Sequence, residues 1–406
     1  MQPRPYQLEG RDFLVARPRA LLADEMRVGK TPQAIMAADA VQAGRVLVLC
    51  PAGAAYQWRE QWADWSPNRS PATILSAEPI SPTFQGVAIA SYNRAVQHRA
   101  ALSTGFRWDV LIPDESHYAK NPEAQRTHMV YAKGGIGWNA NRIWALSGTP
   151  APNHAGEVWP MLRAFGVVQC SYLDFVNAFC YYDWKSGTVF GNRPTMLPQL
   201  RELMRPILLR RLLKDVAPQM PKIAYNLLAV KPVRGVDLRT DRADDVDTED
   251  RIAVATAKAP LLAQEVIDNM RLQTYKQTVV FGFHREPLRL VGEKLTGAGI
   301  DVSIIDGAVP PARRHAMQGR FKDGYCQALL VQIIAGGTAV DLSAAQHGYF
   351  LELDYVPDNN AQAAHRLVNV QTQLPVTMDV VTWPGTKDDK VQRTLLRKVR
   401  GAVFTS

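Results

Sequence analysis

Cysteine is scarce in this sequence, and its four copies are far apart. They stand at positions 50, 170, 180 and 326 of a 406-residue chain. Four are too few for a disulfide framework, and no two of them have the C-x-x-C spacing of a metal clamp. The histidines show no regular spacing either, which disfavours a metal cluster built from them. The sequence therefore predicts a protein of a reducing compartment.

Long apolar runs are also missing. No stretch of about eighteen apolar residues occurs, and the N-terminal region has no apolar core of the kind found in signal peptides. We therefore expect no membrane association and no secretion, and predict a cytoplasmic protein. Hydrophobic residues make up 47% and charged residues 21% of the chain, which excludes a mostly disordered chain, a collagenous repeat and a coiled coil.

The charge is positive and unevenly distributed. The net charge is +9, although residues 235–251 carry seven acids and three bases, so the rest of the chain carries +13. Two segments are especially basic: residues 205–234 hold seven bases and one acid, and residues 387–400 hold six bases and two acids. An excess of this kind predicts a polyanionic partner, most simply nucleic acid. The alternative interpretation is a set of solvated helix faces.

Short apolar runs alternate with longer amphipathic stretches along the chain. This pattern is typical of buried parallel strands joined by helices. The runs are Arg45–Pro51, Val87–Ser91, Val110–Asp114, Ile143–Ser147, Thr278–Phe283, Val302–Asp306, Ala328–Ile333, Tyr349–Leu353 and Met378–Trp383. They predict an α/β protein of two lobes, residues 1–228 and 252–406, each a mostly parallel sheet flanked by helices. The acidic residues 229–251 would link the lobes, and a small helical insertion at about 155–220 would end the first.

A phosphate-binding loop is indicated by residues 23–31, ADEMRVGKT. The segment follows the apolar residues 20–22 and opens a helical pattern. A loop that enters a helix N-terminus directs backbone N–H groups at an anion. Gly29, Lys30 and Thr31 would bind the phosphates of a nucleotide, with the Thr31 hydroxyl on Mg²⁺. The strict form of this motif has glycine five residues before Gly29, where this sequence has Asp24.

Two further motifs follow apolar runs. Asp114 and Glu115 end the run VLIPDE, and strand ends are where ligands sit in α/β sheets. Asp114 would hold Mg²⁺ and Glu115 would act as general base on the attacking water, although such a pair can also merely cap the next helix. The segment 146–150, LSGTP, contains Thr149 and could link the phosphate site to a bound strand, or be an ordinary turn.

DEMRVGKT, DESH and LSGTP, in this order and spacing, resemble motifs I, II and III of helicase superfamily two. More narrowly, the first half resembles the Swi/Snf-like ATPases. PYQLEG looks like their Q motif, with Gln7 as the adenine contact, and residues 207–222 resemble the LRR…DV…PK passage that ends their first lobe. AKAP (257–260) together with DESH resembles the HARP-like annealing-helicase branch, and the lack of accessory domains suggests a phage or bacterial source.

The resemblance implies two RecA-like lobes that use ATP and Mg²⁺ to move along DNA, in replication, recombination or repair. It favours translocation, remodelling or annealing of duplex, forked or single-stranded DNA by a monomer, and it names no protein partner. Two alternatives stay open at this point. One is a strand-separating DNA helicase, and the other is a nucleotide-gated DNA-binding module that hydrolyses ATP poorly.

In the second half, the resemblance covers motifs IV to VI and departs from them in places. Arg366 matches the first arginine of motif VI and would close onto the γ-phosphate, but Asn369 stands where a second arginine is expected. Motif V has Ala339 in place of a glycine. Arg27 stands in the phosphate loop where the family usually has glycine. We hypothesise that Arg27 partly replaces the missing positive charge, unless its side chain points to solvent.

The predicted DNA contacts follow from the resemblance alone and would fall on phosphate and sugar. They are Trp58, Ser91, Tyr92, Thr149, Gly307 and Gly337. Trp58, Trp62 and Trp65 also have helical spacing, a pattern more typical of a core stripe than of a base-stacking platform. The aromatic patch 179–184 could be a DNA wedge, but the favoured interpretation is a packed helical protrusion.

Overall fold

The computed structural model describes residues 1–105, 107–218, 222–230, 248–333, 341–368, 374–384, 388–389 and 392–396. The chain divides into two compact units, Met1–Val216 and Ala217–Ser406, called the first and second unit below. Most of the predicted acidic linker lies outside the described residues, so its boundaries stay a prediction. Among the helices that are described, none is both long and apolar enough to cross a bilayer.

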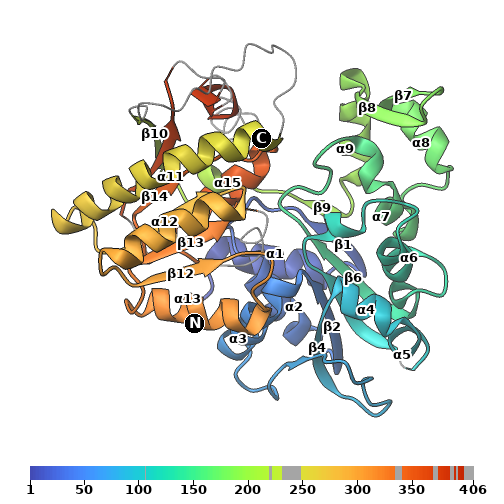
Figure 1. Ribbon diagram of the computed structural model, residues 1–406. Helices are drawn as coiled ribbons and strands as arrows, with labels where there is room; N and C mark the ends of the chain where they lie inside the picture. The colour runs from blue at the N-terminus through green and yellow to red at the C-terminus, as the bar shows by residue number, and fades with distance from the viewer. Residues whose placement is uncertain are drawn as a thin grey trace. The chain divides into compact units, whose positions relative to one another are not determined.

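The first unit is built on a seven-stranded parallel sheet in the order β3-β4-β2-β5-β6-β1-β9 (Figure 1). Valine, leucine and isoleucine fill its central strands, which are buried on both faces, as expected when helices cover a parallel sheet. The strands are β1 (Arg19–Leu22), β2 (Arg45–Cys50), β3 (Thr73–Ile74), β4 (Gly86–Ser91), β5 (Trp108–Pro113), β6 (Ala140–Leu146) and β9 (Leu208–Leu209). All four strands predicted for this part of the chain are confirmed.

Helices connect these strands. The α-helices of the sheet are α1 (Pro5–Val15), α2 (Lys30–Ala40), α3 (Ala55–Trp65), α4 (Tyr92–Gln97), α5 (Arg99–Thr104) and α6 (Gln125–Tyr131). Short 3-10 turns are η1 (Ala52–Ala54), η2 (Ser116–Ala119), η3 (Ile136–Asn139), η4 (Ala155–Val158) and η5 (Pro194–Met196).

The predicted insertion is present, and it contains a hairpin as well as helices. Its helices are α7 (Trp159–Ala164), α8 (Tyr172–Phe179), α9 (Leu197–Met204) and α10 (Leu213–Val216). Between α8 and α9, β7 (Cys180–Asp183) and β8 (Thr188–Asn192) form an antiparallel pair. The favoured interpretation of residues 179–184 as part of a helical protrusion was therefore wrong beyond Phe179. Consecutive tyrosines with a Lys-Ser-Gly turn after them suit a strand and turn better than a helix.

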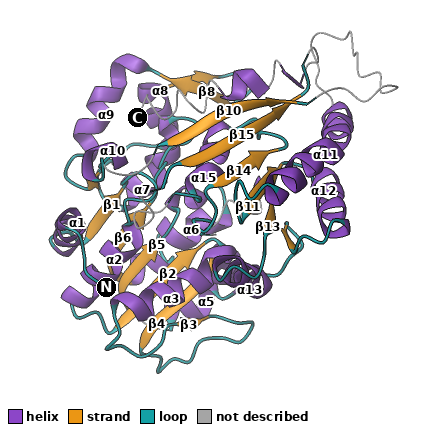
Figure 2. Cartoon of the chain, turned by 90° about the vertical axis from the view of Figure 1, so that its left-hand side faces the viewer, coloured by secondary structure: helices purple, strands orange, loops and turns teal. Residues whose placement is uncertain are grey.

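The second unit has a six-stranded parallel sheet in the order β10-β15-β14-β11-β13-β12 (Figure 2). Its strands are β10 (Ile223–Ala229), β11 (Thr278–Gly282), β12 (Val302–Ile305), β13 (Ala328–Gln332), β14 (His347–Phe350) and β15 (Val376–Thr382). Its helices are α11 (Thr248–Arg271), α12 (Arg285–Gly297), α13 (Pro311–Lys322) and α15 (Pro357–His365). The five strands predicted here are confirmed. β10, whose residues were assigned to the first lobe, pairs with β15 and so belongs to the second sheet.

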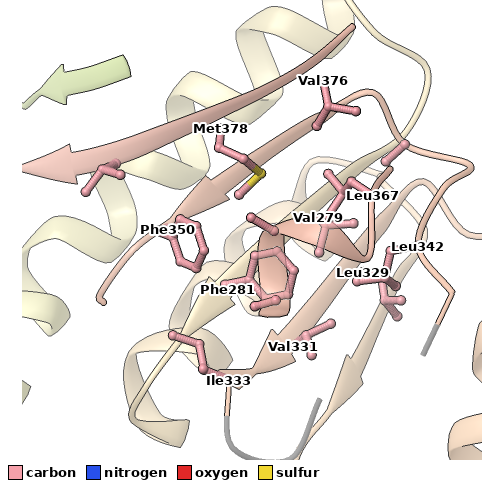
Figure 3. Packing of buried hydrophobic residues seen from close by; sticks show 14 of the residues in the cluster. Val279, Phe281, Leu329, Val331, Ile333, Leu342, Phe350, Leu367, Val376 and Met378 are labelled. Carbon is pink, nitrogen blue, oxygen red and sulfur yellow. The ribbon is translucent and has the colours of Figure 1, made fainter. Parts of the chain in front are cut away.

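The core of the second unit follows from strand alternation. Val279 and Phe281 of β11 lie in one buried cluster with Leu329 and Val331 of β13 (Figure 3). The residue between them, Val280, lies in a second cluster on the other face. Because side chains alternate across a strand, a continuous apolar run covers both faces of the sheet.

In the second unit, the lysine of the AKAP segment forms a buried ion pair. Lys258 of α11 is fully buried, and its ammonium donates to both Asp388 carboxylate oxygens, at 3.0 and 2.9 Å. It also donates to the carbonyl oxygen of Val381 at the end of β15. A buried ammonium needs such partners, because desolvating an unpaired charge is costly. This lysine therefore has a structural function, fastening α11 to the last strand.

Candidate nucleotide site and its supports

The loop between β1 and α2 has the geometry of an anion site. Gly29 begins α2 from a left-handed conformation, with φ of +89°. This conformation suits glycine and turns the first backbone N–H groups of α2 toward the loop. The Lys30 ammonium donates to the loop carbonyl of Asp24 at 2.7 Å. The predicted residues Gly29, Lys30 and Thr31 are thus together at a helix N-terminus, where they could bind phosphate.

Gln7 of α1 lies against this loop. Its side chain is buried, and its carbonyl oxygen accepts from the backbone N–H of Arg4 at 2.9 Å. A Cβ atom on Gly29 would come within 2.6 Å of the Gln7 amide nitrogen. Glycine at position 29 is therefore required for close approach as well as for backbone conformation. The contact brings the predicted adenine-binding residue next to the phosphate loop, and its adenine contact stays a prediction.

Asp24, which replaces the glycine of the strict motif, is the centre of a buried network. Its side chain is fully buried and forms an ion pair with Arg211 at 2.6 Å, with a second bond to Arg211 Nε at 3.1 Å. Gln33 of α2 donates to the same carboxylate and accepts from Arg211. Arg211 lies just beyond β9, which pairs with β1. In the sequence this arginine is only part of the LRR resemblance, and its contact with the loop was not predicted.

The network also fixes α1. Arg211 donates to the carbonyl oxygen of Tyr6, and a Cβ atom on Gly10 would lie 2.8 Å from its guanidinium nitrogen. The same Cβ would collide with the Gln33 side chain at 1.6 Å. Glycine in mid-helix is unfavourable in itself, and here the close approach of three elements accounts for it. The Q motif, the phosphate loop and the LRR passage thus form one packed unit.

Asp114 and Glu115 follow β5, as predicted. The Asp114 carboxylate accepts from the Trp58 indole N–H at 2.7 Å and from the Glu115 backbone N–H at 3.0 Å. Burial, and then the neighbouring charge of Glu115, raise the pKa of Asp114 to about 7. Glu115 has a left-handed backbone with φ of +47°, a strained conformation for a non-glycine residue. Because this site destabilises the negative charge of Asp114, a bound cation would stabilise the carboxylate.

Trp58 and Tyr92 do not lie on a DNA-binding surface, and these two predictions were wrong. Each side chain is 2% exposed. Trp58 binds the Asp114 carboxylate, and the Tyr92 hydroxyl donates to the Asp114 carbonyl oxygen at 2.9 Å. Both side chains therefore hold Asp114 of motif II in place. The core interpretation of the tryptophan stripe is confirmed for Trp58 and Trp62, since Trp62 is 1% exposed.

Ser91 has a structural contact too. Its hydroxyl accepts from the Arg94 backbone N–H at 3.2 Å and caps α4. The Thr149 backbone N–H donates to the Ser147 hydroxyl at 3.2 Å. The predicted DNA contacts of Ser91 and Thr149 stay predictions.

His117 links motif II to motif III. Its Nδ1 atom lies 3.3 Å from a Glu115 carboxylate oxygen and 3.1 Å from the Ser147 hydroxyl. Burial, and then the positive charge of Lys120, lower the pKa of His117 to about 4, so the ring is neutral at pH 7. A Cβ atom on Gly148 would be 3.5 Å from the Lys30 ammonium. Motifs I, II and III therefore contact one another within the first unit.

Comparison with known proteins agrees with this geometry. Residues 6–235 match the SNF2-related domain, and residues 258–370 match the helicase conserved C-terminal domain. The chain belongs to the SNF2-related family. It therefore has the SNF2-related and C-terminal domains of a helicase-type ATPase, and its two units are each built on a parallel α/β sheet.

Several relatives of this SNF2-related chain are similar over nearly its whole length. It is 26% identical to the SWI/SNF-related matrix-associated actin-dependent regulator of chromatin subfamily A-like protein 1 of Drosophila melanogaster, over 98% of this chain and 55% of that protein. It is 26% identical to the human DNA annealing helicase and endonuclease ZRANB3, over 98% of this chain and 40% of that protein. The chain thus spans about half the length of the curated relatives it matches.

Among solved structures, the SWI2/SNF2 ATPase core of Sulfolobus solfataricus in complex with double-stranded DNA matches with a TM-score of 0.49 and 18% identity. The match covers 99% of this chain and 92% of that one.

In this SNF2-related chain, replacing Trp58 by phenylalanine should change the pH dependence of ATP hydrolysis. The indole N–H lowers the pKa of Asp114, so its removal should raise that pKa above about 7. Asp114 can bind a cation only when deprotonated, so activity is lost as pH falls through this pKa. We therefore expect the acid limb of the rate profile to move to higher pH. Steady-state hydrolysis between about pH 6 and 9 measures it.

Trp62→Phe is the matched control for that variant. Trp62 is equally buried, but its indole N–H has no hydrogen-bond partner in the described part of the chain. Its removal should leave the profile in place. Equal profiles for the Trp58 and Trp62 variants would contradict the assigned function of the Trp58–Asp114 bond.

Arg27 has a left-handed backbone with φ of +68°, a conformation that glycine adopts without steric cost. A β-branched residue tolerates this conformation worst, so Arg27→Val should be less stable than Arg27→Gly by about 1–2 kcal/mol. It should therefore unfold at a lower temperature. Thermal unfolding of the two variants tests this; equal midpoints would refute it.

Single-turnover hydrolysis by Arg27→Ala tests the separate charge hypothesis, which a rate equal to the wild type would refute.

The predicted residues of the second unit are partly described. Gly307 is exposed just after β12, and its N–H donates to the Gln332 side chain at 3.2 Å. Arg366 follows α15 and is half-buried. Gly337, Ala339 and Asn369 lie outside the described residues. The functions assigned to all of them stay predictions.

Proposed function

We propose that this chain is a DNA-dependent ATPase of the Swi/Snf type that moves along duplex or branched DNA and remodels or anneals it. The observation that carries the proposal is the contact chain from Glu115 through His117 to Ser147. It ties the general base to motif III, so a rearrangement at motif III changes the geometry of hydrolysis. The charge of +13 outside residues 235–251 favours a DNA track, as do relatives named as annealing helicases.

Each residue of the site has a chemical task in this proposal. Lys30 leaves the loop carbonyls to bind phosphate oxygens, and Gln7 reads the adenine. Glu115 accepts a proton from the attacking water, for which a carboxylate near a neutral imidazole is suited. His117 holds the Glu115 side chain in place and stays uncharged near pH 7.

The residues also fit Mg²⁺. The Asp114 carboxylate and the Thr31 hydroxyl are oxygen donors, which this cation prefers. Burial and the charge of Glu115 raise the pKa of Asp114 even though the Lys30 ammonium acts to lower it, and a divalent ion would stabilise the carboxylate further. When bound, Mg²⁺ would neutralise phosphate charge during transfer.

The test is steady-state ATP hydrolysis with no polymer, single-stranded DNA, blunt duplex, forked DNA and RNA, with Lys30→Ala as the blank. We expect strong stimulation by a DNA form and none in the blank. Stimulation by RNA alone would refute the DNA track. Hydrolysis at the level of the blank, with DNA binding intact, would refute the motor and leave a nucleotide-gated binding protein.

A further inference from the structure

The β7–β8 hairpin presents exposed aromatic rings. Tyr181 is 44%, Trp184 68% and Phe190 69% exposed, unusual values for such large apolar side chains. The hairpin lies with α8 and α9 at the end of the first unit opposite β4 (Figures 1 and 2). None of the three rings belongs to the nucleotide site.

A bulge gathers two of these rings on the outer face. Tyr182 pairs with Val189 while Tyr181 pairs with Gly191, so Phe190 is the extra residue of β8. Tyr182 and Val189 pack against the core of the first unit. Phe190 is turned outward instead and stacks on Tyr181, with ring centroids 5.8 Å apart and planes at 15°. A bulge that re-aims a side chain is a built feature rather than an accident of packing.

The hairpin is held firmly at both ends. At its base, Asn192 accepts from the Ala155 backbone N–H at 2.6 Å, and Arg193 donates to the Cys180 carbonyl oxygen at 2.9 Å. At its turn, the Asp183 carboxylate accepts from the Lys185 backbone N–H and the Ser186 hydroxyl, at 2.9 and 2.6 Å. The rings are therefore presented on a fixed support, which lowers the entropic cost of binding.

Positive charge accompanies the rings. The Arg193 guanidinium lies 5.7 Å from the centroid of Tyr181, and Lys185 is exposed at the turn beside Trp184. The whole insertion, residues 155–216, has eight bases and five acids. Flat aromatic faces beside cations match a strand that offers unpaired bases and phosphates. A duplex offers only its phosphates, because its bases are stacked within it.

We infer that the β7–β8 hairpin binds unpaired DNA bases by stacking, as a second DNA surface separate from the track. The inference rests on the proposed function only in taking DNA as the polymer. Its consequence is a preference for DNA that contains a single-stranded segment, such as a fork, over blunt duplex.

The test compares the wild type with the double variant Trp184→Ser, Phe190→Ser. Both side chains are largely exposed, so the fold should tolerate the changes. Trp138→Ser is the matched control, because Trp138 is 62% exposed in the same unit with a lysine 5.9 Å from its ring. The probes are a labelled oligothymidylate, an abasic strand of equal length and a blunt duplex, followed by fluorescence anisotropy. ATP hydrolysis with blunt duplex is measured in parallel.

We expect the double variant to bind oligothymidylate at least about tenfold more weakly, from the loss of base stacking. Binding of the abasic strand and of the duplex should be unchanged, and so should duplex-stimulated hydrolysis. Phe190→Tyr should keep tight binding. Unchanged affinity for oligothymidylate would overturn the inference, as would equal losses for the abasic strand or in the Trp138 control. Loss of a self-association instead of DNA binding would mark a protein-docking surface and also overturn it. Absent hydrolysis in the wild type would refute the motor while leaving this binding test valid.

Discussion

Replacing Arg211 by alanine is expected to destabilise the first unit by about 3–5 kcal/mol. The change leaves the Asp24 carboxylate fully buried without its guanidinium partner, at the base of the phosphate loop. It also removes donors to Gln33 and Tyr6. Because the loop depends on this network, nucleotide affinity should fall together with stability. Chemical unfolding and binding of a fluorescent ATP analogue measure the two effects.

The control is Arg205→Ala. Arg205 belongs to the same basic segment, but its side chain is 79% exposed and pairs only weakly, at 3.3 Å, with the exposed Glu202. Its removal should cost less than about 1 kcal/mol. The double variant Asp24→Asn, Arg211→Met should lose less stability than the sum of the two single variants. In the double variant no charge is left buried without its partner. Additive losses would contradict a direct coupling between Asp24 and Arg211.

The second large effect is expected for Glu115→Gln. Glutamine keeps the size of the side chain and can still contact His117, but it cannot accept the proton of the attacking water. Hydrolysis should fall by about 10²–10⁴-fold while ATP affinity stays close to that of the wild type. Single-turnover hydrolysis and equilibrium nucleotide binding separate the two quantities.

Glu123→Gln is the control for charge alone, because Glu123 is exposed shortly after motif II. It should hydrolyse ATP at the wild-type rate. A Glu115→Gln enzyme that keeps most of its rate would assign the general base to another group, with Asp114 the nearest carboxylate.

The parts of the fold that could be predicted are those encoded locally. Nine strands were found from apolar runs, since burial on both faces requires a continuous run. β9 and β10 were among the strands that were not predicted, and both depend on pairing with distant segments of the chain. β9 is two residues long and is stabilised by its pairing with β1, while β10 belongs to a sheet whose other strands come much later. Neither pairing leaves a signal in the neighbouring sequence.

For the site, the residue types and their order were predictable, but the side chains that hold the site residues in place were not. Trp58 and Tyr92 were assigned to DNA because a motif does not say which way a side chain points. Only the fold shows that both point inward, to Asp114. The importance of Arg211 was hidden in the same way, because its partner Asp24 is distant in sequence. The hairpin bulge at Phe190 likewise depends on one extra residue in a pairing that the sequence does not reveal.

The contact between Asp24 and Arg211 spans 187 positions of the chain. During synthesis, the phosphate loop emerges from the ribosome early, while the arginine and the β9 strand that complete its support emerge much later. Until then Asp24 would have no guanidinium partner, and β1 would have an unpaired edge, which is the kind of surface that chaperones protect. The nascent chain should therefore acquire ATP binding late and abruptly, when the LRR passage has emerged, rather than gradually as the preceding strands form.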